Sequence, residues 1–177
     1  LGDVYKRQKI MNVKPTYMFR TITLRPHWFQ YVINELPASV VFVVSFCLYV
    51  KPLYESFLMR EIIFCVNSIT LLYIIFRLIY FARMEYVITR EQIIIMHGVL
   101  SHQTDYVELY RVVDYRQHRN FMQQLFGLKT ISIYSGDRNN SIVNMIGIKK
   151  DCDIVSEIRQ RVEYNKHHKG IYEITNR

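Results

Sequence analysis

Residues 86–135 decide the fold class of this chain, and they read YVITREQIIIMHGVLSHQTDYVELYRVVDYRQHRNFMQQLFGLKTISIYS. Short runs rich in β-branched and aromatic residues alternate here with tight turns such as the one at Gly98, a pattern typical of β-strands. The connections are too short for parallel crossovers, so we expect antiparallel pairing. We expect about seven strands, of which the clearest cover residues 85–89, 92–97, 102–110, 112–118, 128–135 and 141–148.

One segment within this stretch has helical spacing instead of strand alternation. Phe121, Leu125 and Phe126 fall at a helical period, and Gly127 ends the pattern just before the next strand. We expect Gly127 to adopt the left-handed conformation that lets the chain turn directly into that strand. A ligand-binding loop at residues 117–120 is the alternative interpretation.

Two apolar segments precede the strands. Residues 62–82 read IIFCVNSITLLYIIFRLIYFA, which is long enough to cross a bilayer, since crossing takes about 20 residues. Residues 32–50 approach the same length and are flanked by aromatic residues, as at a membrane interface. Residues 51–61 predict a short turn, so residues 32–83 form a transmembrane hairpin. Arg77 lies near the end of its segment, where we expect its side chain to reach the headgroups.

Two other interpretations of these segments fit the sequence less well. Buried helices of a soluble bundle would each show a polar face, and neither segment does. A signal peptide would begin earlier in the chain and would be followed by a small-residue cleavage site, which does not follow the first segment. The transmembrane hairpin is therefore the preferred prediction.

The charge distribution indicates how the hairpin is oriented. The chain carries 23 Lys and Arg against 15 Asp and Glu, a net charge of +8. Counted along the sequence, residues 1–83 hold ten basic and four acidic residues, whereas residues 84–148 hold six of each. Because the basic excess flanks the hairpin, we expect both termini in the cytoplasm. We expect no nucleic-acid partner, because the folded region has no basic excess.

The two ends of the chain have different characters. Residues 1–10 precede the first methionine, and we interpret them as a non-native leader, which leaves residues 11–31 as a cytoplasmic N-terminal segment. Residues 151–165 predict a helix with Asp151 as its N-cap and an apolar stripe that covers an open end of the sheet. That stripe consists of Ile154, Val155, Ile158 and Val162. Residues 166–177 show no pattern, and we expect a flexible tail.

Candidates for chemistry are few. The sequence contains no nucleophile elbow, phosphate loop or paired-carboxylate signature, so we predict neither an enzyme nor a cofactor. His97 and His102 flank a turn, but two ligands are too few for a structural zinc site, and we predict no metal. Arg111, Arg116 and Arg119 lie along one expected strand. The last two are candidates for an anion pocket, although solvated strand edges carry such residues more often.

Three patterns in this sequence carry a resemblance to a known family. They are Y-x-(I/V)-T-x-x-x-(I/L) with a following glycine, (I/V)-x-L-x-x-(I/V)-x-x-V, and L-x-x-x-(L/F)-G-x-x-x-I-x-I. The matching residues are Tyr86, Ile88, Thr89, Ile93 and Gly98, then Val107, Leu109 and Val112, then Phe126, Gly127, Ile131 and Ile133. Tyr115 and Met122 depart from the second and third patterns. In this order, and after two membrane segments, the patterns resemble the YdbS-like bacterial pleckstrin-homology (PH) membrane proteins.

The resemblance implies an α+β fold. The two-helix transmembrane hairpin is followed by a PH-like, half-open antiparallel barrel of about seven strands over residues 84–165, closed by the C-terminal helix. It also implies that the short helix is a plug, whose Phe121, Leu125 and Phe126 belong to the core at the barrel mouth. We expect residues 84–165 to fold alone.

The implied function is that of a non-enzymatic module anchored in the bacterial cytoplasmic membrane. It would bind a protein partner or assemble with itself at the cytoplasmic face, through the open strand edge around Arg111, Arg116 and Arg119. The alternative is a PH domain that binds lipid headgroups or small anions. The neutral charge balance of residues 84–148 disfavours this alternative, because anionic headgroups reward each nearby basic residue by about 1 kcal/mol.

Overall fold

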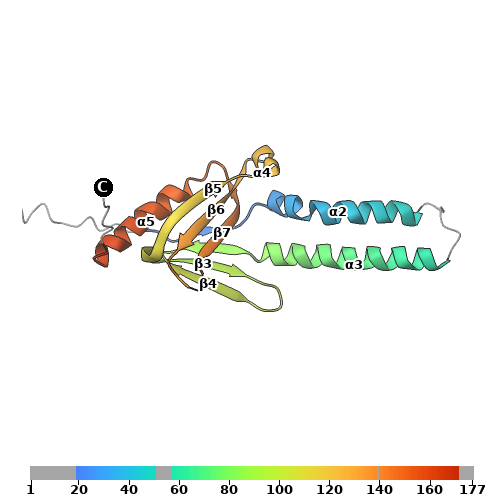
Figure 1. Ribbon diagram of the computed structural model, residues 1–177, viewed down its shortest axis with the longest axis horizontal. Coiled ribbons are helices and arrows are strands. Elements are labelled where there is room, and N and C mark those ends of the chain that lie inside the picture. Colours follow the sequence, from blue (N-terminus) through green and yellow to red (C-terminus); the bar gives the residue numbers. More distant parts are fainter. Residues whose placement is uncertain (1–18, 51–56, 139, 172–177) are drawn as a thin grey trace, which may run out of the picture.

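A computed structural model describes residues 19–50, 57–138 and 140–171 of the chain. Figure 1 shows a β-domain at one end and two long helices that run side by side away from it. The elements are β1 (Ile22–Leu24), α2 (Trp28–Val50), α3 (Phe57–Ala82), β2 (Glu85–Ile88), β3 (Gln92–His97), β4 (Gln103–Glu108), η1 (Leu109–Arg111), β5 (Val112–His118), α4 (Phe121–Leu125), β6 (Leu128–Ser135), β7 (Ile142–Lys149) and α5 (Ile154–His168).

The seven strands form two antiparallel sheets. The first sheet has the order β1-β2-β3-β4 and the second the order β5-β6-β7. Within the described residues no strand pairing joins the two sheets, so the barrel is half-open, as predicted. Strand boundaries agree with the prediction to within one or two residues. One difference is η1, a single 3-10 turn that ends the strand expected over residues 102–110.

The domain core lies between the sheets and beneath α5. Strand residues such as Ile93, Ile131 and Met145 are fully buried and alternate with outward-facing side chains, because successive residues of a strand point to opposite faces. Tyr86 is also fully buried, and its hydroxyl accepts a hydrogen bond from the backbone N–H of Ile146 at 3.0 Å. That contact ties β2 of the first sheet to β7 of the second.

Helix α5 covers the open end of the sheets, as predicted. Ile154, Ile158 and Val162 are buried against the core, and Val155 packs at its edge. The predicted N-cap Asp151 is wrong by two residues, since the carboxylate that accepts a hydrogen bond from the first turn belongs to Asp153. The helix also continues to residue 168, so the first three residues of the predicted tail are helical.

Strand β1 has no counterpart among the predicted strands. It pairs antiparallel with β2, with Ile22 opposite Ile88 and Leu24 opposite Tyr86. Ile22 and Leu24 pack against the domain core. The helix hairpin is therefore inserted between the first and second strands of the domain, and part of the segment 11–31 belongs to the first sheet.

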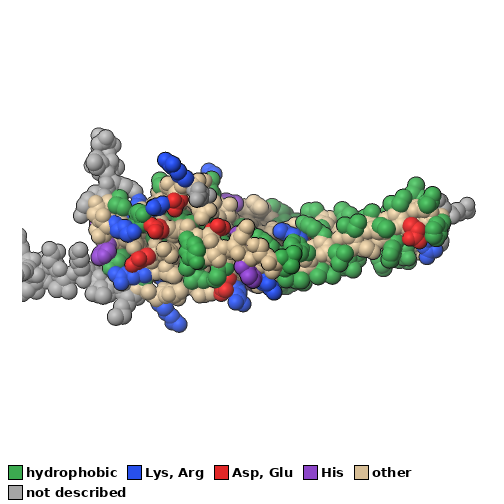
Figure 2. Space-filling view, turned by 90° about the horizontal axis from the view of Figure 1, so that it is seen from below, with side chains coloured by type: hydrophobic (Ala, Val, Ile, Leu, Met, Phe, Trp, Pro, Cys, Tyr) green, Lys and Arg blue, Asp and Glu red, His purple; other side chains and the backbone are tan. Residues whose placement is uncertain are grey.

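Helices α2 and α3 occupy the two apolar segments. Both begin earlier than predicted, so residues 57–61 are helical rather than part of a turn. Residues 51–56 of that predicted turn lie outside the described residues. Both helices are long and apolar enough to cross a membrane. Figure 2 shows apolar side chains along the whole length of the helix pair, with charged groups on the domain and near the far tip.

Helix α4 does not plug the barrel, so the assignment of its apolar residues to the core is wrong. Phe121 is 77% exposed, Leu125 is 70% exposed and Phe126 is 39% exposed. The buried side chain of this helix is Gln123. In Figure 1, α4 lies at the periphery of the domain, beside the first turns of α2.

Candidate functional site

Strand β5 is an edge of the second sheet. It pairs with β6 and has no partner strand on its other side within the described part of the chain. Arg116 and Arg119 are exposed toward the end that leads into α4. Neither makes an ion pair with a described residue. An edge strand with exposed backbone groups is the geometry that accepts an added strand.

Arg111 lies at the opposite end of β5, in η1, and is engaged with its own chain. Its Nη1 is 2.5 Å from Asp137 Oδ1, and its Nε donates a hydrogen bond to the Tyr110 hydroxyl at 2.9 Å. The hydrogen bond with Tyr110 and the negative charge of Asp137 raise the pKa of Arg111. The structure therefore separates the three arginines into a paired one and two that are open to contact.

The two long helices join through polar groups. Glu35 is only 3% exposed, and its Oε1 accepts a hydrogen bond from Arg77 Nε at 2.7 Å. Farther along the pair, the Ser45 hydroxyl lies 3.0 Å from Asn67 Oδ1. The expectation that Arg77 reaches outward to headgroups is therefore wrong, because the guanidinium turns inward to a carboxylate on the neighbouring helix. We call these two contacts, Glu35–Arg77 and Ser45–Asn67, the polar seam. The sequence does not indicate them, because each helix contributes only isolated polar residues within an apolar run.

A buried amide pair fixes α4 to the first turns of α2. Gln123 Nε2 donates hydrogen bonds to Gln30 Oε1 and to Thr130 Oγ1, both at 2.8 Å. Gln30 in turn donates to Asn34 Oδ1 at 2.8 Å. The Phe126 ring also stacks on Phe29 with ring centroids 4.7 Å apart. These contacts hold α4, β6 and the base of α2 in one arrangement.

Two features of the sequence indicate this junction, although neither is part of the helical or strand period. Asn120 and Gln123 have the spacing of a helix-capping box, and Gln123 Oε1 does accept the Asn120 backbone N–H at 3.0 Å. Gly147 is isolated within a strand, which marks a close approach of another segment. Its φ is +71°, and an added Cβ would lie 2.8 Å from Gln30 Cβ, so only glycine admits α2 here.

The remaining predicted glycines occupy turns. Gly127 has a φ of +65°, the left-handed conformation expected of it, with open space around the position of a Cβ. Gly98 has a φ of +119°, and an added Cβ would lie 1.9 Å from Ser101 O. Gly98 is therefore essential to the β3–β4 turn, residues 98–102, on steric grounds as well as by conformation.

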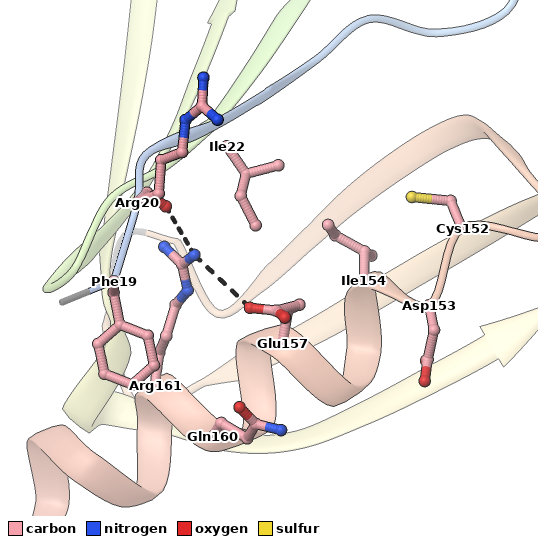
Figure 3. A pocket seen from close by; sticks show the side chains of 9 residues that line it. All are labelled: Phe19, Arg20, Ile22, Cys152, Asp153, Ile154, Glu157, Gln160 and Arg161. Atoms are coloured by element: carbon pink, nitrogen blue, oxygen red, sulfur yellow. Dashed lines mark hydrogen bonds and ion pairs between the residues drawn. The ribbon is translucent and has the colours of Figure 1, made fainter. Parts of the chain in front are cut away.

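An open cavity of about 550 Å³ lies between the N-terminal segment and α5 (Figure 3). Arg161 is almost fully buried beside it, and its guanidinium donates to the carbonyl oxygens of Arg20, Ile88 and Thr89 at 2.8 to 3.1 Å. These bonds clamp α5 to the N-terminal segment and to the β2–β3 turn. The charged residues that line the cavity are Arg20, Arg161, Asp153 and Glu157. With two charges of each sign, the cavity favours neither an anion nor a cation.

The histidines flanking the β3–β4 turn have separate surroundings. His97 Nε2 lies 3.4 Å from Asp105 Oδ2, and its ring stacks on Tyr80 at the end of α3. His102 is exposed in the turn itself. Among the described residues, no group of three or more His, Cys, Asp or Glu is arranged to hold a metal ion.

Comparison with known families identifies the class of the chain. A family model described as "Bacterial PH domain" matches residues 28–162, which is well over half of the sequence. The chain therefore belongs to the bacterial PH domain family. PH domains are generally non-catalytic binding modules. Neither a curated protein nor a solved structure matches the chain.

Proposed function

We propose that the chain is a non-enzymatic, membrane-anchored PH module of the YdbS-like type, which contacts a protein partner or another copy of itself at the cytoplasmic face of the bacterial membrane. The observation that carries this proposal is the reversed polarity of the helix pair. Its apolar side chains face outward along both helices, while Glu35 and Arg77 pair between them. Such an arrangement suits a lipid environment and would be unstable in water.

The exposure of the two helices argues against a soluble core. In the most apolar stretches of α2 and α3, almost no residues are buried by other parts of the protein. A core helix of a soluble protein would be covered on its apolar face. Within a bilayer the same side chains contact acyl chains, and the inward polar groups find partners across the helix pair.

The orientation follows from the charged residues at the two ends of the helix pair. Arg25 and Arg83 lie at the end that joins the domain, whereas Arg60 and Glu61 balance each other near the far end. The positive-inside rule then favours a cytoplasmic domain and two cytoplasmic termini.

Single-cysteine labelling in intact cells tests the anchor and its orientation. We expect a membrane-impermeant maleimide to label a cysteine at Phe57, at the far end of the pair, and to leave cysteines at Met11 and Arg177 unlabelled until the cells are opened. Labelling of either terminus from outside would contradict the orientation. Equal labelling of all three positions only after lysis would contradict the transmembrane anchor.

The contact surface that we propose is the open edge of β5, with Arg116 and Arg119 as its charged groups. Confinement beside a membrane raises the effective concentration of a neighbouring partner, so a weak edge contact is sufficient. Arg111 is less suited to this contact, because Asp137 already balances its charge.

Cross-linking in membranes tests this surface. We expect the double charge reversal Arg116→Glu with Arg119→Glu to remove cross-linked products formed by the wild-type protein. A matched control reverses Arg138 and Arg159, which are also exposed but lie outside β5. A cross-linking pattern that is identical in both double variants and in the wild type would reject the β5 surface, while leaving the membrane anchor untouched.

A further inference from the structure

Two apolar tips of the domain project toward the helix pair. In Figure 1, α4 lies beside the first turns of α2, and the β3–β4 turn extends alongside the end of α3. Phe121 and Leu125 in α4 are mostly exposed, and Leu100 at the β3–β4 turn is 94% exposed. In Figure 1, α4 and the β3–β4 turn both lie at the level along the long axis where the helices leave the domain. Large apolar groups held in water are costly unless something covers them.

The structure holds α4 firmly in this outward position. Gln123 anchors the buried side of the helix to Gln30 and Thr130, so the opposite side must face away from the domain. Trp28, Phe29 and Phe126 form a continuous stack from the start of α2 to the end of α4, with centroid separations of 4.2 and 4.7 Å. Aromatic side chains in this position are typical of the boundary between headgroups and acyl chains. The apolar side of α4 is therefore continuous with the surface of the hairpin.

The β3–β4 turn is held in place in a similar way. Arg83, directly after α3, donates from Nη1 to the Val99 carbonyl oxygen at 3.1 Å. Gly98 gives the turn a conformation that other residues would not allow. The turn thus keeps Leu100 near the end of α3 rather than folding it back over the domain.

Basic groups accompany the apolar tips. Arg119 immediately precedes the N-cap of α4, and Arg83, which follows α3, bonds to the turn that carries Leu100. An apolar tip flanked by cationic groups is the composition of segments that lie in the membrane interface. A second protein would not require the tips to share the level at which the hairpin leaves the domain.

We propose that α4 and the β3–β4 turn insert shallowly into the cytoplasmic leaflet of the same bilayer that the hairpin crosses. This inference rests on the proposed membrane anchor and extends it. The domain is then docked on the lipid surface by Phe121, Leu125 and Leu100 in addition to its two covalent connections to the hairpin. Because β5 runs away from α4, its far end with Val113 lies farther from the lipid, up to about 20 Å along the strand at a rise of about 3.3 Å per residue.

Depth measurements on full-length protein test the docking. In a background with Cys47, Cys65 and Cys152 replaced, single cysteines at Leu100 and Phe121 carry an environment-sensitive fluorophore. The control is Val113, which is 68% exposed and lies at the other end of β5. A fourth protein retains only Cys65, which is exposed on α3 and reports on the anchor. All are placed in nanodiscs of phosphatidylethanolamine and phosphatidylglycerol, so that both faces are accessible.

We expect a nitroxide on a shallow acyl carbon to quench probes at Leu100 and Phe121 several-fold more than the probe at Val113, and aqueous iodide to show the reverse order. If Leu100 and Phe121 respond like Val113 while Cys65 stays protected from iodide, the docking is wrong and the anchor stands. Protection of Phe121 from both quenchers would mean that protein covers it, which also overturns the docking. Exposure of Cys65 to iodide would reject the anchor itself.

Discussion

In the β-domain, apolar side chains such as Ile93 and Ile133 are buried, whereas along the helix pair residues such as Leu72 face outward and the charged groups of Glu35 and Arg77 face each other. One chain thus holds two regions of opposite polarity. Under the proposed membrane anchor, each region matches its own solvent, because water expels apolar surface and acyl chains expel unpaired charge. Helix α4 lies between the regions and has both features, with a buried Gln123 and an exposed Phe121.

The largest expected change in stability comes from removing one partner of the Glu35–Arg77 ion pair inside the helix pair. We expect Arg77→Leu to lower the free energy of unfolding of the hairpin by about 3–5 kcal/mol, because the buried Glu35 carboxylate loses its partner. The loss of helical circular dichroism during titration of the micellar protein with sodium dodecyl sulfate measures this change.

A double variant separates the loss of a partner from the loss of charge. With Glu35→Leu and Arg77→Leu together, no unpaired charge remains, and we expect stability within about 1 kcal/mol of the wild type or above it. A single variant as stable as the wild type would contradict the polar seam, and so would a double variant that is less stable than the single one.

The next largest effect compares equal truncations in the two regions. Ile133→Ala in the domain core is expected to cost about 2–5 kcal/mol, since it leaves a cavity in a packed interior. Leu72→Ala on the outer face of α3 is expected to cost less than about 1 kcal/mol, because lipid tails or detergent replace the lost contact. Thermal unfolding in the same micelles measures both. Equal losses would indicate that Leu72 packs against protein.

The sequence predicted most of the fold because its evidence is local. Strand alternation, turn residues and apolar length are each read within one segment, and β3, β5 and β6 match their predicted ranges. Strand β1 escaped prediction because three residues show too little alternation to identify a strand. The prediction that residues 84–165 fold alone remains open, and such a fragment would lack the contacts of Ile22 and Leu24 with the core.

The errors concern contacts between segments that are distant in sequence. A helical period in Phe121 and Leu125 identified the helix but not which side faces the domain, since that depends on the distant Gln30. The same holds for Arg77, whose partner Glu35 is on the other helix. When two neighbouring helices are both largely apolar, their sequences do not show which of the few polar residues will contact each other.

A third prediction concerns the polar group at the centre of the apolar core. Burial raises the pKa of Tyr86 to about 12. Its phenol is neutral in both states below pH 10, and above that the unfolded chain ionises first. The contribution of neutral Tyr86 to the free energy of unfolding is therefore fully present below pH 10. It is lost as the pH rises toward 12, by an amount on the order of 2 kcal/mol.

Comparison with Tyr86→Phe separates the contribution of the Tyr86 phenol from that of the other titrating groups. We expect the unfolding free energy of the variant to fall less steeply than that of the wild type between pH 10 and 12. Parallel curves would show that the phenol does not meet a more apolar environment in the folded protein.

The last comparison concerns the junction, where the β-domain meets the helix pair. Gln123→Leu removes the donor that joins Gln30 of α2 to Thr130 of β6, and we expect a loss of about 1–3 kcal/mol from the acceptors left without a partner. Gln124→Leu is the matched control, since Gln124 is the exposed neighbour in the same helix, and it should change stability by less than about 0.5 kcal/mol. Hydrogen exchange adds a readout of position, because release of α4 should speed exchange at the Gln124 and Phe126 amides, which bond within the helix. If Gln123→Leu leaves both stability and exchange unchanged, the amide pair does not couple the hairpin to the domain.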